Sequence, residues 1–411
     1  MMGLQELTLG EIYDVRDGTH DSPKYQDDGY PLVTSKNLKQ GALNLDKIKY
    51  ISEEDYLKIN ERSAVHMGDV LLAMIGTIGN PIVIEIEPNF AIKNVALFKI
   101  SSEQNSRFLK YYLESPFVTE KMTREAKGTT QKFVGLGYLR SFPMLLPPLT
   151  EQKRIVAILD QAFAEIDKAR ANAEQNLKNA RELFESYLQQ IFSQRGEGWV
   201  ENTLGNICSF KHGFAFKSEY FTKDSDLVLL TPGNFFEKGG YKDRGEKQKY
   251  YKGPFPEEFL LAKGSLLVAM TEQAAGLLGS PALVPENSIF LHNQRLGLVE
   301  LIPDFQENVS LEFLFHFFNT NYFRAKVQKT ASGLKVRHTS PKKMQVISVW
   351  IPESRNEQDR IAREIFKFKE KTIGLERVYK QKLNQLDELK KSILQKAFTG
   401  ELTQNNHDAA A

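Results

Sequence analysis

The sequence is poor in cysteine, in long apolar runs and in excess charge of either sign. Cys208 is the single cysteine among 411 residues, so no disulfide can form within the chain, which fits a reducing cytoplasm. No apolar run approaches the ~20 residues that a membrane span needs. The N-terminal stretch also lacks the basic and apolar regions of a signal peptide. We therefore expect a cytoplasmic protein without membrane contact, in which Cys208 is a small buried residue.

Motifs for catalysis and metal binding are missing as well. The stretch "GTIGNP" at Gly76 lacks the Lys-Ser/Thr ending of a phosphate loop. The stretch "NPIV" at Asn80 lacks the paired proline and aromatic residue of an amino-methyltransferase, and "PDFQENV" at Pro303 lacks the lysine of a nuclease carboxylate set. The seven histidines have no metal-ligand spacing. The sequence thus predicts a non-catalytic chain that holds no cofactor and no metal.

What the sequence does contain is an internal repeat. A shift of 206 residues places "EQKRI" at Glu151 on "EQDRI" at Glu357, and the match continues without a gap for about forty residues. Upstream, "TLGEI" returns as "TLGNI", "GDVLLAM" returns as "GSLLVAM", and Leu97 in "KNVALF" matches Leu296 in "HNQRLG". The chain is therefore a tandem duplication of one unit, whose loops differ in length.

Each copy ends in the pattern of a long amphipathic helix. Apolar or small residues recur at steps of three and four, from Ile155 to Ile191 and from Ile361 to Ile393. The second stripe includes Leu375 and Leu389. We expect the two helices to pack antiparallel through these stripes. About 44 residues at ~1.5 Å each then give a rod of ~66 Å. The alternative is two independent surface helices.

Three further expectations concern these helices. Thr150 is the predicted N-cap of the first helix, and Gly400 is the predicted stop of the second. An aspartate in place of Leu177 or Leu383 is expected to weaken the pairing by several kcal/mol, because a lone buried charge is costly.

The remaining segments read as mixed α/β. Short strand-like runs are separated by Gly, Pro and Asn turns, and one helical segment follows them in each copy. The predicted fold is therefore α/β (α+β), with two globular domains joined by a pair of long antiparallel helices. The predicted bounds are 1–146 for the first domain, 147–197 for the first long helix, 198–352 for the second domain, 353–402 for the second long helix and 403–411 for the tail.

This organisation resembles the specificity subunit of type I restriction-modification systems. The resemblance rests on the duplication and on the helix entries "PPLTEQKRIVAILD" and "EQDRIAREIF", and it extends from Leu7 to Leu402. The second entry, "IPESRNEQ", departs from the family's form by one extra residue and a missing second proline. The resemblance implies two target recognition domains that each read one half of a split DNA sequence. It also implies paired helices that space the domains and dock two methyltransferase subunits.

Polar and basic loops supply the candidate DNA-binding residues, because Gln and Asn can pair with adenine, Arg with guanine, and Lys with phosphate. The null hypothesis for each is an ordinary solvated loop. In the first domain the candidates are Thr19, His20, Lys24, Lys36, Asn37, Lys39, Thr129, Thr130, Gln131 and Lys132. In the second domain they are Lys211, His212, Lys217, Asn234, Lys242, Arg244, Lys247, Lys249, Lys335, Arg337 and His338.

The resemblance also implies which partners this chain needs. They are double-stranded DNA, two methyltransferase subunits and restriction (translocase/endonuclease) subunits, with S-adenosylmethionine, ATP and Mg bound by those subunits. The charge of the chain, 54 Lys and Arg against 52 Asp and Glu, is too balanced to hold DNA alone through phosphates, so partners should supply much of that contact. Two alternatives stay open: an autonomous nuclease or methyltransferase with unfamiliar motifs, and a scaffold that only holds proteins together.

Overall fold

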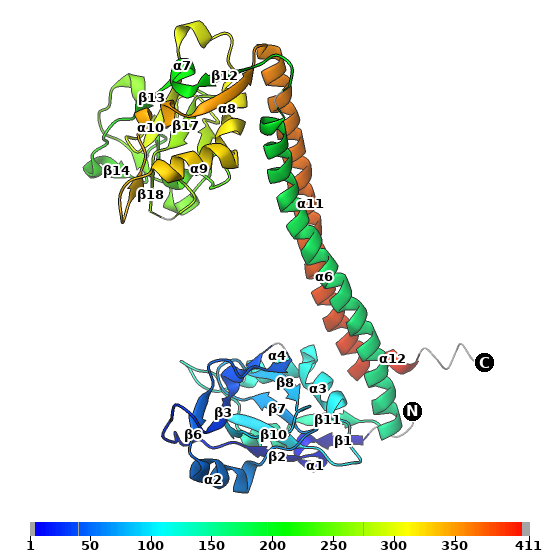
Figure 1. Ribbon diagram of the computed structural model, residues 1–411. Coiled ribbons are helices and arrows are strands. Elements are labelled where there is room, and N and C mark those ends of the chain that lie inside the picture. Colours follow the sequence, from blue (N-terminus) through cyan, green and yellow to red (C-terminus); the bar gives the residue numbers. More distant parts are fainter. Residues whose placement is uncertain (1–4, 40, 195, 274, 405–411) are drawn as a thin grey trace, which may run out of the picture. The chain divides into compact units, whose positions relative to one another are not determined.

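The computed structural model describes residues 5–39, 41–194, 196–273 and 275–404. The chain divides into two compact units (Figure 1). The first unit combines residues 1–174 with residues 380–411, and the second comprises residues 175–379. Each unit therefore holds one globular domain and one end of both long helices.

The first unit is built on small sheets of short strands, most of which pair antiparallel. Its strands are β1 (Gln5–Thr8), β2 (Asp14–Asp17), β3 (Tyr30–Thr34), β4 (Leu38–Lys39), β5 (Ala42–Leu43), β6 (Lys49–Ile51), β7 (Val70–Ala73), β8 (Gly79–Val83), β9 (Ala91–Lys93), β10 (Val95–Lys99) and β11 (Pro143–Leu146). Its shorter helices are α1 (Leu9–Ile12), the 3-10 helix η1 (Ser35–Asn37), α2 (Glu53–Ser63), α3 (Ser106–Glu114), α4 (Pro116–Glu125), α5 (Leu136–Arg140) and α12 (Glu401–Gln404). The main sheet has the order β2-β10-β7-β8, and a mixed sheet has the order β6-β3-β9.

The core of the first unit lies on both faces of strand β7. All four of its residues are buried, and successive side chains of a strand point to opposite faces. Val70 and Leu72 join the cluster that contains α3, whereas Leu71 and Ala73 join a second cluster with Ile92 of β9. The run of apolar residues is therefore continuous because both faces of the strand are covered.

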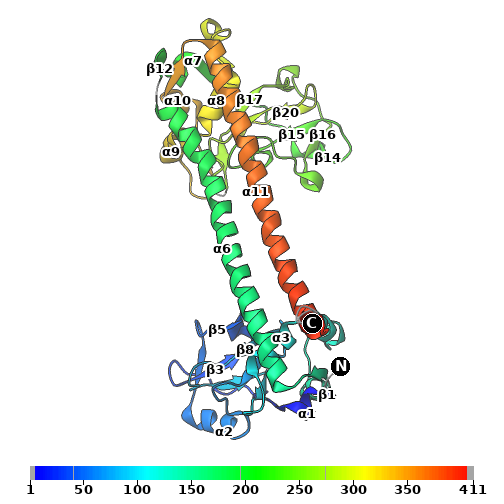
Figure 2. The same ribbon diagram turned by 90° about the vertical axis from the view of Figure 1, so that its right-hand side faces the viewer.

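The second unit repeats this framework with longer loops. Its strands are β12 (Trp199–Thr203), β13 (Cys208–His212), β14 (Phe221–Thr222), β15 (Val228–Leu230), β16 (Tyr250–Tyr251), β17 (Leu266–Ala269), β18 (Thr271–Glu272), β19 (Pro281–Leu283), β20 (Phe290–His292), β21 (Leu296–Leu301), β22 (Arg337–His338) and β23 (Ser348–Pro352). Its shorter helices are α7 (Leu204–Ile207), η2 (Ser218–Tyr220), η3 (Pro232–Asn234), η4 (Gly245–Lys247), η5 (Glu257–Phe259), η6 (Pro303–Phe305), α8 (Leu311–Phe318), α9 (Asn321–Thr330) and α10 (Pro341–Gln345). Strands β14, β16, β15 and β20 form a sheet of their own (Figure 2).

The register of the main sheet corrects one detail of the predicted repeat. Leu97 of β10 pairs with Leu71 of β7, and Leu298 of β21 pairs with Leu267 of β17. Because Leu71 and Leu267 match in the repeated motif, Leu97 corresponds to Leu298 and not to Leu296. The second domain has extra residues in the turn between β20 and β21. The sequence match had treated this turn as equally long in both domains.

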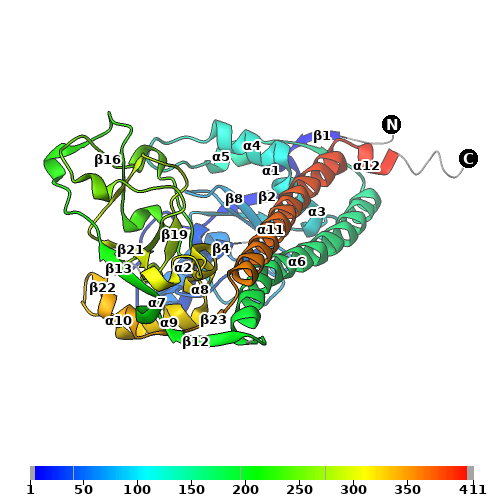
Figure 3. The same ribbon diagram turned by 90° about the horizontal axis from the view of Figure 1, so that it is seen from above.

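The two long helices are α6 (Leu149–Ser193) and α11 (Arg355–Phe398), and they run side by side in opposite directions (Figures 2 and 3). In the first unit, Lys390 lies over the ring of Phe163 at 4.7 Å. In the second unit, the rings of Tyr187 and Phe368 are 4.1 Å apart. The partner numbers fall on α11 as they rise on α6, so the antiparallel prediction is confirmed.

The start of each long helix is held by a buried glutamine. Gln152 is 3% exposed and donates to the carbonyl oxygen of Pro147 at 2.9 Å, while Gln358 is 1% exposed and donates to that of Pro352 at 2.7 Å. The glutamine lies five residues after the proline in the first copy and six after it in the second. The same hydrogen bond therefore forms in spite of the extra residue in the second helix entry. The first helix already begins at Leu149, so the predicted N-cap at Thr150 is wrong.

Fewer residues of the apolar stripes on the long helices are buried than their periodicity suggests. Leu177 and Leu383 are half-buried, and Leu375 and Leu389 are exposed at 42% and 47%. The expected cost of an aspartate at Leu177 or Leu383 was therefore too large, because solvent reaches both positions. At the other end of α11, Gly400 turns the chain with a φ of +83°, as predicted for a stop. Within the described ranges, none of the helices combines the length and apolar character that crossing a bilayer would require.

Candidate nucleic-acid interface

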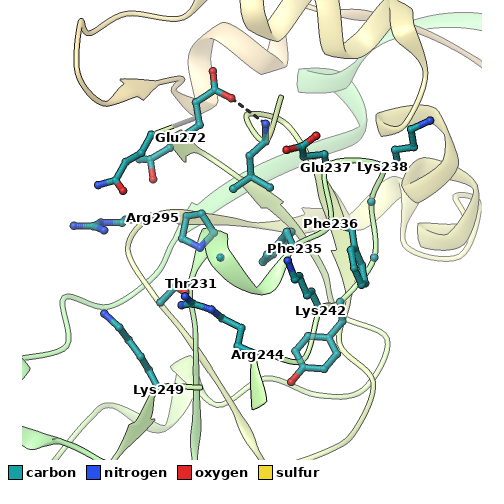
Figure 4. A pocket seen from close by; sticks show the side chains of 18 of the residues that line it. Thr231, Phe235, Phe236, Glu237, Lys238, Lys242, Arg244, Lys249, Glu272 and Arg295 are labelled. Carbon is teal, nitrogen blue, oxygen red and sulfur yellow. Dashed lines mark hydrogen bonds between the residues drawn. The ribbon is translucent and has the colours of Figure 1, made fainter. Parts of the chain in front are cut away.

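A basic cleft of about 1150 Å³ lies in the second unit (Figure 4). Its wall carries several cations, among them Lys242, Arg244, Lys249 and Arg295. Lys242 lies over the ring of Phe236 at 5.7 Å, and Lys249 lies over that of Phe221 at 5.2 Å. The cleft thus brings three of the predicted lysine and arginine candidates together, and its charge suits an anionic ligand.

One buried carboxylate organises the edge of this cleft. Glu272 is 3% exposed and accepts hydrogen bonds from the backbone amides of Gly276, Leu277 and Leu278 at 3.1, 3.0 and 2.8 Å. Arg337 donates to the same carboxylate at 3.2 Å and to Gln328 Oε1 at 2.5 Å. The guanidinium of Arg337 is therefore occupied within the protein, so we withdraw it as a reader of guanine.

Both candidate asparagines also serve the protein itself. Asn37, 8% exposed, accepts from the backbone amide and hydroxyl of Thr34 at 2.9 Å each. Asn234, 1% exposed, accepts from the equivalent groups of Thr231 at 3.0 Å each and donates to Gln248 Oε1 at 2.8 Å. They cap the 3-10 helices η1 and η3, and their burial leaves no free amide edge for a base. The proposal that they bind DNA is therefore dropped.

The two polar loops near the ends of the domains form matching hairpins. Lys127 and Phe133 exchange two backbone hydrogen bonds of 2.9 and 2.8 Å, and Ser332 and His338 exchange two of 3.0 and 2.8 Å. Each hairpin turns at a glycine in the left-handed region, with a φ of +99° at 128 and of +100° at 333. The tips expose Thr129, Thr130, Gln131 and Lys132 in the first unit and Leu334, Lys335 and Val336 in the second.

Two further candidate loops of the first unit meet at Asn94. This residue has a φ of +54°, and its Oδ1 lies 2.8 Å from His20 Nδ1. Its backbone amide donates to the carbonyl oxygen of Thr19 at 3.1 Å, and its carbonyl oxygen accepts from Ser35 at 3.1 Å. The loops that carry Lys24, Lys36 and Lys39 are thus brought together, and these three lysines are exposed.

Other candidates lie apart from the basic cleft. Lys211 forms an ion pair of 2.6 Å with Glu258, and this hydrogen bond raises the pKa of the lysine. Lys217 lines a separate cavity of about 360 Å³ together with Phe214 and Tyr251. Among the candidates, His212, Lys247, Lys335 and His338 are also outside the set of residues that line the basic cleft.

Sequence reasoning missed several residues of the cleft wall, among them Arg295, Thr271 and Gln273. Arg295 stands in the turn that is longer in the second domain, so a length difference at this turn was the available signal. Thr271 and Gln273 follow the buried strand β17, where the sequence gives no sign of the cleft.

Two observations concern metal binding and the reactivity of the cysteine. None of the described residues gather three His, Cys, Asp or Glu side chains in the manner of a metal site. Cys208 is fully buried, as expected, and burial raises the pKa of its thiol to about 12, so it is protonated at neutral pH.

Comparison with known proteins decides the family. The family described as "Type I restriction modification DNA specificity domain" matches residues 1–175 and 196–385. The chain belongs to this family. Its two domains are target recognition domains of a type I specificity subunit.

Curated relatives and solved structures agree with this assignment. The EcoBI specificity subunit of Escherichia coli is 29% identical over 173 residues, which cover 41% of this chain and 36% of that protein. The MjaVIII specificity subunit of Methanocaldococcus jannaschii is 21% identical over 92% of this chain and 87% of its own length. The HsdS subunit of Thermoanaerobacter tengcongensis has the same fold, with a TM-score of 0.62 at 18% identity and 97% of each chain covered. A chain from a study of assembly and conformational transition in the type I R-M system gives a TM-score of 0.74 at 18% identity, over 98% of this chain and 99% of that one.

Proposed function

We propose that this specificity subunit directs DNA methylation and cleavage by reading a bipartite target, with one half-site for each domain. The observation that carries the proposal is the pair of hairpins at 127–133 and 332–338. Their backbones match, yet Thr129 and Gln131 in one correspond to Leu334 and Val336 in the other. Two identical frames that present different side chains suit two different half-sites.

The DNA-binding set that remains is smaller than the sequence suggested. In the first domain it consists of Thr19, His20, Lys24, Lys36, Lys39, Thr129, Thr130, Gln131 and Lys132. In the second domain it consists of Lys242, Arg244, Lys247, Lys249, Lys335 and His338, to which the cleft adds Arg295, while Lys211, His212 and Lys217 stay secondary candidates. The nearly neutral net charge of +2 supports a complex in which partner subunits provide further phosphate contacts.

The long helices serve as the spacer in this proposal. Helix α6 continues without a break for 45 residues and passes from one unit to the other. At ~1.5 Å per residue this is a length of about 68 Å. A spacer of fixed length supports a target with an unread gap of constant size.

The partners are proposed to be two methyltransferase subunits and restriction subunits. Phe117 is 58% exposed and Leu145 is 48% exposed, and both line a cavity of about 600 Å³ in the first unit. Their equivalents in the second unit are Tyr322, which is 42% exposed, and the partly exposed Trp350. An apolar surface that occurs twice supports the binding of two copies of one partner. Those subunits, and not this chain, would bind S-adenosylmethionine, ATP and Mg in the cytoplasm.

Methylome sequencing tests the proposal directly. Cells that contain this chain and its partner subunits should methylate one bipartite motif, and deletion of this chain alone should abolish that methylation. As a control, an inactive methyltransferase subunit should give the same loss while this chain is still present. Methylation that continues without the chain would contradict the proposal. Methylation or cleavage by the purified chain with S-adenosylmethionine or a divalent metal would favour the autonomous enzyme instead.

A further inference from the structure

One apolar side chain of the second unit stands fully in solvent. Leu334, at the tip of the 332–338 hairpin, has a relative exposure of 104%, and Val336 beside it is 44% exposed. One arm of the hairpin, β22, pairs with β18. The turn itself is tight, because a Cβ at Gly333 would lie only 2.1 Å from the carbonyl oxygen of Val336. A ligand that covered Leu334 would supply the burial energy that this side chain does not gain in the free protein.

The surroundings of the hairpin indicate the chemistry of such a ligand. Val336 lines the basic cleft together with Arg244, Lys249 and Arg295. A protein or membrane surface would call for a broad apolar patch, whereas this tip offers two apolar side chains next to several cations. Duplex DNA combines both features, since anionic phosphates flank grooves in which thymine exposes an apolar methyl group.

We propose that the 332–338 hairpin enters the major groove of the second half-site and that Leu334 packs against the C5-methyl group of a thymine. This inference rests on the proposed function. The major groove accommodates a two-stranded β-ribbon, and the hairpin has this width because Ser332 and His338 pair across it. Strand β18 pairs with one arm of the hairpin through Thr271 and Glu272. Buried Glu272 forms an ion pair of 3.2 Å with Arg337 of the hairpin, so it is a positioning residue for the tip.

The first unit supplies the matched control for this hairpin. Phe133 pairs with Ile75 in the first unit, as His338 pairs with Thr271 in the second. Phe133 and His338 are therefore equivalent, and counting back along each hairpin makes Thr129 the equivalent of Leu334. The tip there is polar, so it would read base edges by hydrogen bonds and not through a methyl group. The two domains thus differ in the kind of contact that their hairpins make.

The experiment uses the subunit in complex with its methyltransferase partners and duplexes that carry the methylated motif. Each thymine of either half-site is replaced in turn by deoxyuridine, which removes only the methyl group. We expect one replacement in the second half-site to weaken binding by the wild-type complex about fourfold, as for the loss of one buried methyl group. Leu334→Ser, which leaves no apolar group at the tip, should bind the thymine and uracil duplexes equally, whereas Thr129→Ala should keep the fourfold difference in the second half-site.

Three results would overturn the inference. One is a second half-site without any A·T pair, and another is a uracil effect that persists in Leu334→Ser. The third is a rise in 2-aminopurine fluorescence that requires Leu334, because unstacked bases would show a wedge between base pairs and not a groove contact. A wild-type complex that binds no motif specifically would refute the proposed function itself, which separates that failure from these three.

Discussion

The two target recognition domains keep the residues that hold their loops and change the residues that the loops present. Asn37 and Asn234 make the same capping bonds within η1 and η3, and the hairpins at 127–133 and 332–338 make the same backbone bonds. Thr129 at the tip of the first hairpin is nevertheless replaced by Leu334 in the second. A buried frame can thus be duplicated while the exposed positions are free to acquire another specificity.

The two interiors also differ, and the differences are chemical. The sheet registers match Ile92 with His292 and Gly76 with Glu272. The second domain thus has a buried imidazole where the first has a hydrocarbon side chain. It also has a buried carboxylate where the first has a glycine. These substitutions do not alter the fold, but they should make the two domains respond differently to pH and to mutation.

The largest expected effect comes from exchanging a whole domain. Replacement of residues 1–146 by the first domain of a relative with another specificity should change one half of the methylated motif completely and leave the other half unchanged. The reciprocal exchange of residues 198–352 should alter only the other half. Methylome sequencing of both chimeras measures this outcome. A chimera that alters both half-sites at once would show that the domains do not read independently.

Acid should destabilise the second unit more than the first. Burial lowers the pKa of His292 to about 4 and that of His316 to about 3. Both imidazoles are neutral in the folded state, while the unfolded chain protonates near 6.5. The contribution of these histidines to the free energy of unfolding is therefore fully present above pH 6.5 and is lost as the pH drops toward 4. The loss is about 2 kcal/mol at pH 5 for His292 alone.

Region-resolved hydrogen exchange between pH 7 and 5 would measure this difference. The opening free energy of β17 and β21 should fall, and that of β7 and β10 should change less. The variant His292→Ile copies the first domain and should remove about half of the pH dependence in the second unit, because His316 contributes a similar amount. An unchanged slope in this variant would show that other groups cause the effect.

Each domain should also depend on its own buried carboxylate. Asp69, 2% exposed, pairs with Lys99 at 2.5 Å in the first unit, whereas Glu272 pairs with Arg337 in the second. Asp69→Asn and Glu272→Gln should each cost about 2 to 3 kcal/mol, because backbone donors and a cation lose their charged acceptor. Hydrogen exchange should locate each loss in one unit only. Equal losses in both units would contradict separate stabilities.

Much of this architecture could be predicted from the sequence. The spacing of apolar residues indicates which face of a helix is buried, and the repeat indicates that the two halves share one fold. The antiparallel helices followed from the 206-residue repeat, and the stop at Gly400 followed from its place after the last apolar residue. Exposure was harder to predict, since Leu375 and Leu389 fit the stripe but lie on the open side of α11. A helix of this length shows more apolar positions than one partner helix can cover.

The candidate site was predicted less well, because the same polar side chain can serve a base or the backbone. Asn37 and Asn234 were assigned to DNA although a threonine stands three residues before each, a spacing that fits a cap. Arg295 was missed because a difference in turn length brings it into the cleft. Leu334 was included in a loop described as polar, and only its exposure in the structure marks it out.

The smallest expected effect separates capping from reading at the asparagines. Asn37→Ala should cost about 1 kcal/mol, the usual loss for a helix cap, with no change in the methylated motif. Asn234→Ala should cost more, about 2 kcal/mol, because Gln248 is 6% exposed and loses its partner. Urea unfolding followed by hydrogen exchange would measure both losses. The exposed variants Thr129→Ala and Leu334→Ser are the matched controls, which should alter discrimination between motifs while leaving stability nearly constant. If Asn234→Ala instead relaxed the second half-site at unchanged stability, the asparagine would be a reader after all, since a cap cannot lose its bonds without weakening the fold that it holds.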